Sequence, residues 1–230
     1  MTIDVATAPT GNTLHMYRAL VGVGMFCGLL IVTVFEVTRP IIAKNRAEAL
    51  QRAVFTVIPE AESSETFVQK ESGAFEPQTE SKDEGMLVYA GYDEDESLVG
   101  VAVEARGMGY ADVITVLYGY SFERDAIVGM QVLESKETPG LGDKIEKDPD
   151  FLANFEALDV SLAEGSVKNP IVAVKSGEKT EPWQIDGITG ATISSVAIAD
   201  MLRASSRQWI PVLEERQADF EKTGAGEAQP

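Results

Sequence analysis

The sequence is short of the two residue types that most often hold metals, since 230 residues include one cysteine and one histidine. These counts exclude a four-cysteine cluster, a zinc finger, a c-type haem site and a disulfide framework. Cys27 lies in the most apolar stretch, where we expect it to act as a small apolar side chain. Any electron chemistry must therefore use a cofactor that needs neither residue type.

Positive charge is also scarce, with 19 Lys and Arg against 37 Asp and Glu and a net charge of −18. The charges of the first forty residues balance, so the acidity belongs to the rest of the chain. An acidic exterior excludes nucleic acid as a partner and disfavours anionic lipid headgroups. No dinucleotide fingerprint is present, because none of the four Gly-x-Gly runs sits in a strand-turn-helix with an acidic follower. We therefore do not expect this chain to oxidise NADH itself.

One long uncharged run stands out near the N-terminus. It extends from Ala19 to Phe35 between Arg18 and Glu36, which is close to the lower length limit for a helix that spans a membrane. A cleaved signal peptide is the alternative, but the run lacks a small-residue cleavage site at its end. We predict an uncleaved anchor. The basic residues that follow it would place the large domain in the cytoplasm, although this rule is weak for long domains.

The remaining sequence predicts an α+β fold. A single N-terminal transmembrane helix should precede a domain with a mostly antiparallel, curved sheet flanked by helices. The predicted regions are an N-terminal tail at 1–17, the anchor at 18–38, a helix and polar connection at 39–84, a globular domain at 85–221 and a disordered tail at 222–230. Expected helices are 43–57, 148–158 and 194–220 with a break at Pro211, and expected strands are 86–92, 98–105, 113–122, 126–134 and 171–175, with one short strand in 60–84.

A run of small and hydroxyl residues precedes the last predicted helix. It reads Thr189-Gly190-Ala191-Thr192-Ile193-Ser194-Ser195. A helix start offers free N–H groups and a positive dipole end, so a phosphate could bind there. A plain helix cap at Thr192 is the competing interpretation. A domain this acidic would repel free FMN, whereas a phosphodiester to a threonine removes one negative charge.

At this point the sequence resembles the FMN-binding domain of the G subunits of the Rnf electron-transport complexes, and more distantly the C subunits of the sodium-pumping NADH:quinone reductases. Two motifs carry the resemblance, the run Asp186 to Ser195 and the loop Glu137-Thr138-Pro139-Gly140-Leu141-Gly142-Asp143-Lys144-Ile145. It implies that Thr192 receives FMN through its phosphate from a flavin transferase that uses FAD and recognises Asp186.

The resemblance also implies the rest of the site. Thr189, Gly190, Ala191 and Ser195 would surround the attachment point. The second loop would lie against the flavin through its own side chains, Glu137, Thr138 and Leu141. The turn Gly107-Met108-Gly109-Tyr110-Ala111-Asp112 departs from the family, which usually has a second glycine pair where Tyr110-Ala111 stands.

By resemblance, the chain is an electron-carrying subunit of a membrane complex that couples ferredoxin and NAD to ion pumping. Its partners would be the other subunits and the flavin transferase, and its domain would lie on the periplasmic side of the inner membrane. Two rivals remain. A hydrolase using Ser194 or Ser195 would need a base, and the one histidine lies in the N-terminal tail. A flavin-free scaffold subunit would use Thr192 only as a cap.

Overall fold

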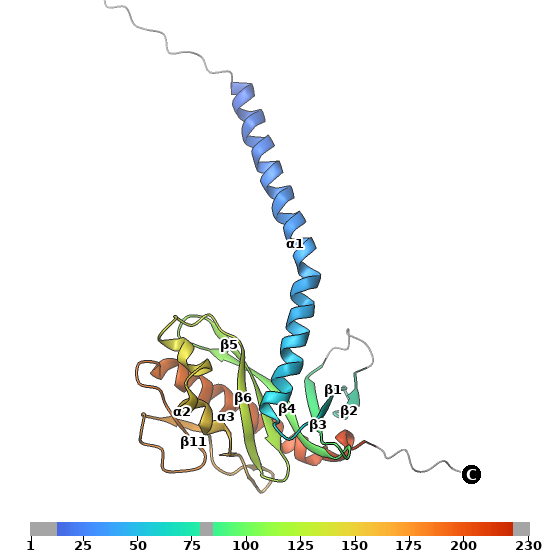
Figure 1. Cartoon of the computed structure of the whole chain (residues 1–230), viewed down its shortest axis with the longest axis vertical. Helices are drawn as coiled ribbons and strands as arrows, with labels where there is room; N and C mark the ends of the chain where they lie inside the picture. The colour runs from blue at the N-terminus through green and yellow to red at the C-terminus, as the bar shows by residue number, and fades with distance from the viewer. Residues whose placement is uncertain (1–12, 79–84, 223–230) are drawn as a thin grey trace, which may run out of the picture. The chain divides into compact units, whose positions relative to one another are not determined.

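The computed structural model describes residues 13–78 and 85–222, and its chain forms two compact units, residues 1–48 and 49–230 (Figure 1). The boundary between the two units falls inside the long N-terminal helix. Most of the predicted tails, and the end of the predicted polar connection at 79–84, lie outside the described residues.

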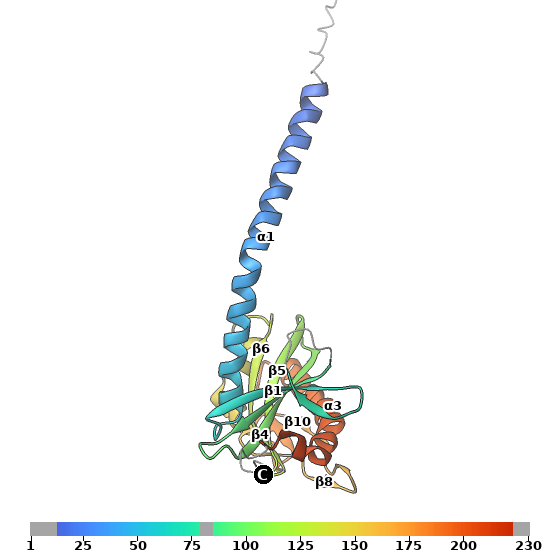
Figure 2. The same ribbon diagram turned by 90° about the vertical axis from the view of Figure 1, so that its right-hand side faces the viewer.

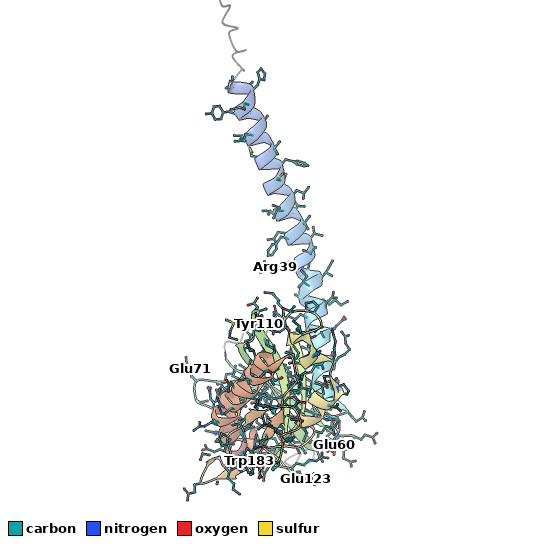
Figure 3. The ribbon with its side chains drawn as sticks, turned by 90° about the vertical axis from the view of Figure 1, so that its left-hand side faces the viewer. Arg39, Glu60, Glu71, Tyr110, Glu123 and Trp183 are labelled. Atoms are coloured by element: carbon teal, nitrogen blue, oxygen red, sulfur yellow. The ribbon has the colours of Figure 1, made fainter. Side chains whose placement is uncertain are left out.

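The N-terminal helix α1 extends from Thr13 to Val57. The predicted helix at 43–57 is confirmed as the last part of α1, which is continuous with the anchor because it continues through Pro40. A proline removes one backbone hydrogen bond, but apolar and helix-favouring residues on both sides continue the helix. Within the described residues, α1 is the one helix long and apolar enough to cross a membrane (Figure 3). The side chains of its most apolar stretch are unburied, as a lipid-facing helix requires.

An antiparallel sheet forms the centre of the second unit (Figure 1). Within the described residues it has seven strands in the order β2-β1-β3-β4-β5-β6-β7. The strands are β1 (Ser63–Gln69), β2 (Phe75–Pro77), β3 (Leu87–Tyr92), β4 (Leu98–Met108), β5 (Val113–Ser121), β6 (Ala126–Glu134) and β7 (Leu158–Asp159). The predicted meander of four strands is confirmed as β3 to β6. The predicted polar connection instead supplies two strands, β1 and β2, because Phe67 and Phe75 are buried there.

Both faces of the sheet are covered, since alternate residues of its central strands point to two different cores. On one face, Val101, Val103 and Tyr118 pack against helix α3 (Thr192–Glu215), which lies across the sheet in Figure 2. On the other face, Ala102 and Leu117 pack against the last turns of α1. The full list of the second core is Ala53, Val54, Val57, Ile58, Tyr89, Ala102 and Leu117.

Two glycines of the sheet allow the end of α1 to pack closely against it. Gly119 and Gly129 are direct partners on β5 and β6. A Cβ added to Gly129 would lie 2.6 Å from both Cα and the carbonyl oxygen of Val57, and one at Gly119 would collide with that same oxygen. Glycine in a strand interior often marks such a close backbone approach.

The chain between β6 and α3 is made of short elements. They are η1 (Gly142–Glu146), α2 (Pro149–Leu152), η2 (Ala153–Phe155), β8 (Leu162–Ala163), β9 (Ser166–Val167), β10 (Val172–Val174) and β11 (Gln184–Asp186). The predicted helix at 148–158 is shorter, because Leu158 begins a strand that pairs with β6. The predicted strand at 171–175 is confirmed as β10, and it pairs in parallel with β11.

The predicted break of α3 at Pro211 was wrong, because the helix continues to Glu215. Pro211 lies only four residues before the helix end, and the buried neighbours Ile210 and Leu213 hold the turn against the core. The short helix η3 (Gln217–Phe220) then places Phe220 against Phe67 and Phe75 of the outer strands. Tyr92 Oη donates to the carbonyl of Phe220 over 2.8 Å, and burial raises the pKa of Tyr92 to about 12.

Candidate functional site

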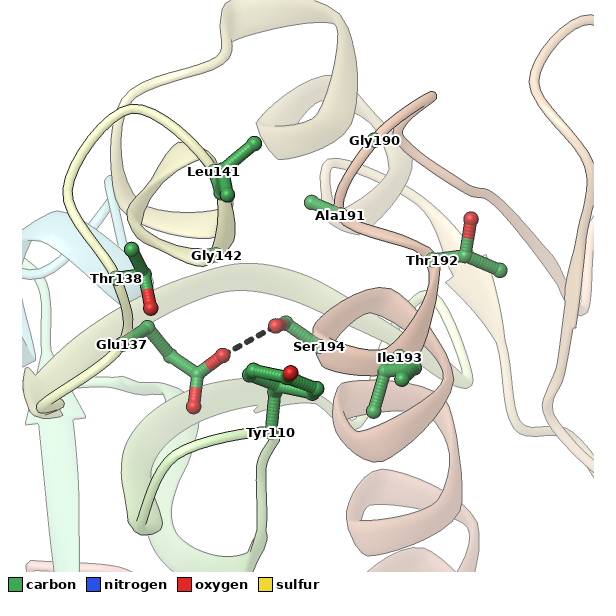
Figure 4. A pocket seen from close by; sticks show the side chains of 10 residues that line it. All are labelled: Tyr110, Glu137, Thr138, Leu141, Gly142, Gly190, Ala191, Thr192, Ile193 and Ser194. Atoms are coloured by element: carbon green, nitrogen blue, oxygen red, sulfur yellow. Dashed lines mark hydrogen bonds between the residues drawn. The ribbon is translucent and has the colours of Figure 1, made fainter.

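A cavity of about 310 Å³ opens where the loop after β6 meets the start of α3 (Figure 4). Its walls come from three segments that are far apart in the sequence. The lining residues are Tyr110, Glu137, Thr138, Leu141, Gly142, Gly190, Ala191, Thr192, Ile193 and Ser194. The fold thus brings together the two motifs that the sequence singled out.

Thr192 is the first residue of α3 and is exposed at the edge of this cavity. The cap position belongs to Ala191, and the Thr192 hydroxyl makes no hydrogen bond within residues 13–78 and 85–222. Figure 4 shows its side chain directed away from Glu137 and Tyr110. A second cavity of about 540 Å³ begins on the other side, and Thr192 lines both cavities. Thr192 is therefore exposed where the two cavities meet.

Backbone conformation and buried hydrogen bonds hold the loop that presents Thr192. Gly190 has φ +88, a left-handed conformation that favours glycine. The buried Ser195 Oγ donates to the carbonyl of Ala191 over 3.0 Å and accepts from the N–H of Ile188 over 3.1 Å. Ser195 does not line the cavity, so its role in this structure is to hold the loop. Thr189 lines the second cavity rather than the first.

Glu137 lies at the base of the cavity and is 6% exposed. Its Oε2 accepts a short hydrogen bond from Ser194 Oγ, and its Oε1 accepts from the N–H of Ala111 over 2.9 Å (Figure 4). Added Cβ atoms at Gly109 or Gly142 would collide with this carboxylate. Both glycines are therefore needed to leave room for it, and Glu137 joins all three segments of the cavity.

The wall that carries Leu141 is held by an ion pair. Asp143 Oδ1 accepts from the N–H of Gly140 over 2.6 Å, and its Oδ2 lies 2.7 Å from Lys147 Nζ. The hydrogen bond from Lys147 holds the pKa of Asp143 below its ordinary value and raises the pKa of Lys147. Thr138 closes the same turn, because its carbonyl accepts from the N–H of Leu141 over 3.1 Å.

Four lining residues were not among the predicted site residues: Tyr110, Gly142, Ile193 and Ser194. Tyr110 and Ile193 are 68% and 57% exposed, and Leu141 opposite them is 52% exposed. Exposed large apolar side chains that gather at a cavity are typical of a binding site for a ring system. The one available signal for Tyr110 was its place in the turn that departs from the family pattern.

Asp186 lies behind the cavity, on β11. Both of its carboxylate oxygens accept from the N–H of Gly177, over 2.8 and 3.0 Å. The buried Asn154, which the sequence did not indicate, receives the N–H of Asp186 over 2.9 Å and donates to its carbonyl over 3.3 Å. Lys179 Nζ lies 3.0 Å from Asn154 Oδ1, and burial lowers the pKa of Lys179. Asp186 thus sits in a constrained turn.

Comparison with known proteins gives the class of the domain. The family model for the FMN-binding domain matches residues 109–206, which include both motifs. The fold is similar to that of Shewanella oneidensis NqrC, with a TM-score of 0.61 and 18% identity over 76% of this chain and 99% of that one. Fold, family model and N-terminal helix together define a membrane-anchored protein with an FMN-binding domain.

Proteins of similar sequence show to which family within this class the chain belongs. The chain is 31% identical over 191 residues to the G subunit of the ion-translocating oxidoreductase complex of Methanosarcina acetivorans, covering 81% of this chain and 88% of that protein. It is 32% identical over 152 residues to the G subunit of the Na(+)-translocating ferredoxin:NAD(+) oxidoreductase complex of Acetobacterium woodii, covering 65% and 68%. The chain belongs to the family of G subunits of ion-translocating oxidoreductase complexes.

Proposed function

We propose that this chain carries electrons within a membrane-bound complex, linked to ferredoxin and NAD, through FMN bound covalently by its phosphate to Thr192. The observation that carries the proposal is the position of Thr192. It is an exposed, unbonded hydroxyl on the first turn of α3, at the edge of a cavity with an apolar rim. The name of the Acetobacterium woodii relative supports the link to ferredoxin and NAD.

The residues present fit FMN. Tyr110, Leu141 and Ile193 offer apolar surface to a ring system, while Thr138 and Ser194 supply hydroxyl groups nearby. The free N–H groups of the first turn of α3, which begins at Thr192, could donate to a phosphate on that residue. When bound, the flavin would supply transfer of one or two electrons. The residues of the chain would hold the group and orient it.

Covalent attachment also suits the charge of this domain. A free FMN dianion would be repelled by a chain with a net charge of −18. A diester with Thr192 carries one negative charge less, and it makes dissociation irrelevant. We propose that a flavin transferase recognises Asp186 and transfers the FMN moiety of FAD to Thr192, so that the threonine oxygen bonds to the FMN phosphorus, the pyrophosphate bond of FAD breaks, and AMP leaves with the hydroxyl proton. The turn of Asp186 lies directly before the loop that presents Thr192.

The test is ultraviolet-excited fluorescence of the protein band on a denaturing gel, after co-expression with a flavin transferase. The wild-type band should fluoresce, and Thr192→Val should lose the signal completely, because valine keeps the shape of the side chain but has no hydroxyl. Fluorescence that persists in Thr192→Val would contradict attachment at this residue.

Thr189→Val is the matched control, because Thr189 is an exposed threonine three residues earlier that does not line the first cavity. This variant should keep the fluorescence. The reverse pattern would make Thr189 the acceptor. A dark wild-type band would favour a flavin-free scaffold subunit, although the structure gives the cap position to Ala191.

We further propose that the domain lies on the periplasmic side of the inner membrane, as the family resemblance implies, with the other subunits of the complex as its partners. The basic residues after the anchor point the other way, but long domains translocate largely regardless of such charges.

A further inference from the structure

Glu137 is the one charged side chain that is buried in the part of the chain that the structure describes. It stands out in a chain with 37 acidic residues, because the other described acids are at least partly exposed. A carboxylate is rarely buried unless hydrogen bonds or a counter-charge compensate for lost water. Its burial beside the cavity therefore needs a physical explanation.

The partners of Glu137 are donors without a full charge. Ser194 Oγ and the N–H of Ala111 donate to its two oxygens, so both oxygens act as acceptors, which is the role of an ionised carboxylate. The positive end of α3 adds a partial charge, because Ser194 lies in its first turn. No lysine or arginine among the described residues forms an ion pair with Glu137. The cavity thus holds a buried carboxylate that has no ion-pair partner among the described residues.

We infer that Glu137 sets the reduction potential of the flavin in this cavity, by placing a buried negative charge beside it. The inference rests on the proposed function, since it concerns FMN at Thr192. Electrons that enter the flavin add negative charge within the same poorly solvated cavity, where like charges repel more strongly than in water. Glu137 therefore makes reduction less favourable and lowers the potential.

A purely structural role for Glu137 is the alternative, because its hydrogen bonds join the turn at Ala111, the loop before Gly142 and the start of α3. Two variants separate these roles. Glu137→Gln keeps the size and one acceptor oxygen but removes the charge. Ser194→Ala keeps the charge and removes a donor that partly compensates for it. A charge effect raises the potential in Glu137→Gln and does not raise it in Ser194→Ala, whereas a packing effect raises it in both variants.

The experiment is a redox titration of the flavin spectrum in the full-length, flavin-loaded protein in detergent, with gel fluorescence to confirm equal loading. Glu137→Gln should raise the potential, with about a tenfold change in the equilibrium constant for reduction, which is about 30 mV for a two-electron couple. Ser194→Ala should leave the potential equal or lower it. Glu123→Gln is the matched control, because Glu123 is an exposed glutamate in the turn between β5 and β6, and it should titrate like wild type.

Three outcomes would overturn the inference. The first is a potential of Glu137→Gln that equals the wild-type value or lies below it. The second is a rise in both variants, which would indicate altered packing. The third is loss of flavin loading in Glu137→Gln with an unchanged melting temperature, which would place Glu137 in maturation. A wild-type band without fluorescence would instead contradict the proposed function itself.

Discussion

At the scale of single residues, Asp143 makes the stability of one cavity wall depend on pH. Its carboxylate holds the N–H of Gly140 and the ammonium group of Lys147, and so fixes the turn that presents Leu141. Because the pKa of Asp143 is lowered in the folded protein, its stabilising contribution is present above the ordinary aspartate pKa of about 3.9. That contribution is lost as the pH falls through the folded value.

We therefore predict that the protection factors of the amide hydrogens in residues 138–143, which are corrected for the intrinsic effect of pH on exchange, fall below about pH 4, whereas those of sheet segments remote from Asp143 and from the pair of Asp112 and Lys136 do not. Asp143→Asn should show the faster exchange already at pH 7, because the amide cannot pair with Lys147 as an ion. The exposed pair of Asp112 and Lys136, in which the pKa of Asp112 is also lowered, provides a comparison within the same protein. Equal exchange of the 138–143 loop in wild type and variant at pH 7 would contradict this account.

The same scale shows what the sequence could predict of the site. Thr192, Gly190 and Ala191 could be identified because hydroxyl and small residues before a helix have a known use, and because a second motif accompanied them. Ser195 illustrates the limit. A serine in this motif could bind a ligand through its hydroxyl. Only the fold shows that the hydroxyl instead bonds to the backbone of Ile188 and Ala191. Tyr110 lies in a departure from the family pattern, so the motif could not reveal it.

At the scale of elements, the contact between α1 and the sheet depends on Gly119 and Gly129. We predict that Gly129→Ala destabilises the second unit by about 1–3 kcal/mol, since its methyl group would overlap the backbone of Val57. Thermal unfolding of the full-length protein in detergent, followed by near-ultraviolet circular dichroism, would measure the change. Gly24→Ala is the control, because nothing lies within 4 Å of an added Cβ there. A wild-type melting temperature for Gly129→Ala would show that the contact is not tight.

The predicted elements differ from the observed ones where long-range contacts decide. The strands β3 to β6 could be predicted because alternation and turns are local signals. The strands β1 and β2 could not, because polar residues surround Phe67 and Phe75 in the sequence, and both rings pack against Phe220 from the far end of the chain. A break of α3 was expected at Pro211, yet the helix continues because the packing of Ile210 and Leu213 outweighs the loss of one hydrogen bond.

At the scale of the whole molecule, two arguments place the second unit on opposite sides of the membrane. The basic residues after the anchor predict the cytoplasm, whereas the family resemblance implies the periplasm. We predict that Glu123→Cys, made in a Cys27→Ala background, reacts with a membrane-impermeant maleimide added to intact cells. Glu123 is exposed in a turn of the second unit. His15→Cys, at the start of α1, should react only after the membrane is opened. The opposite labelling pattern would place the domain in the cytoplasm.

The aromatic contact made by Phe220 has a consequence for how such domains are inherited. The family model matches residues 109–206, yet that stretch lacks the strands β1, β2, β3 and β4, the end of α1 and Phe220 itself. Recombination that moved only the matched stretch into another gene would transfer Thr192, the proposed attachment residue, without four of the seven strands of the sheet that supports it. A segment that can be exchanged as a working module must therefore be longer than the stretch that the family model matches, and it must extend from the last turns of α1 to Phe220.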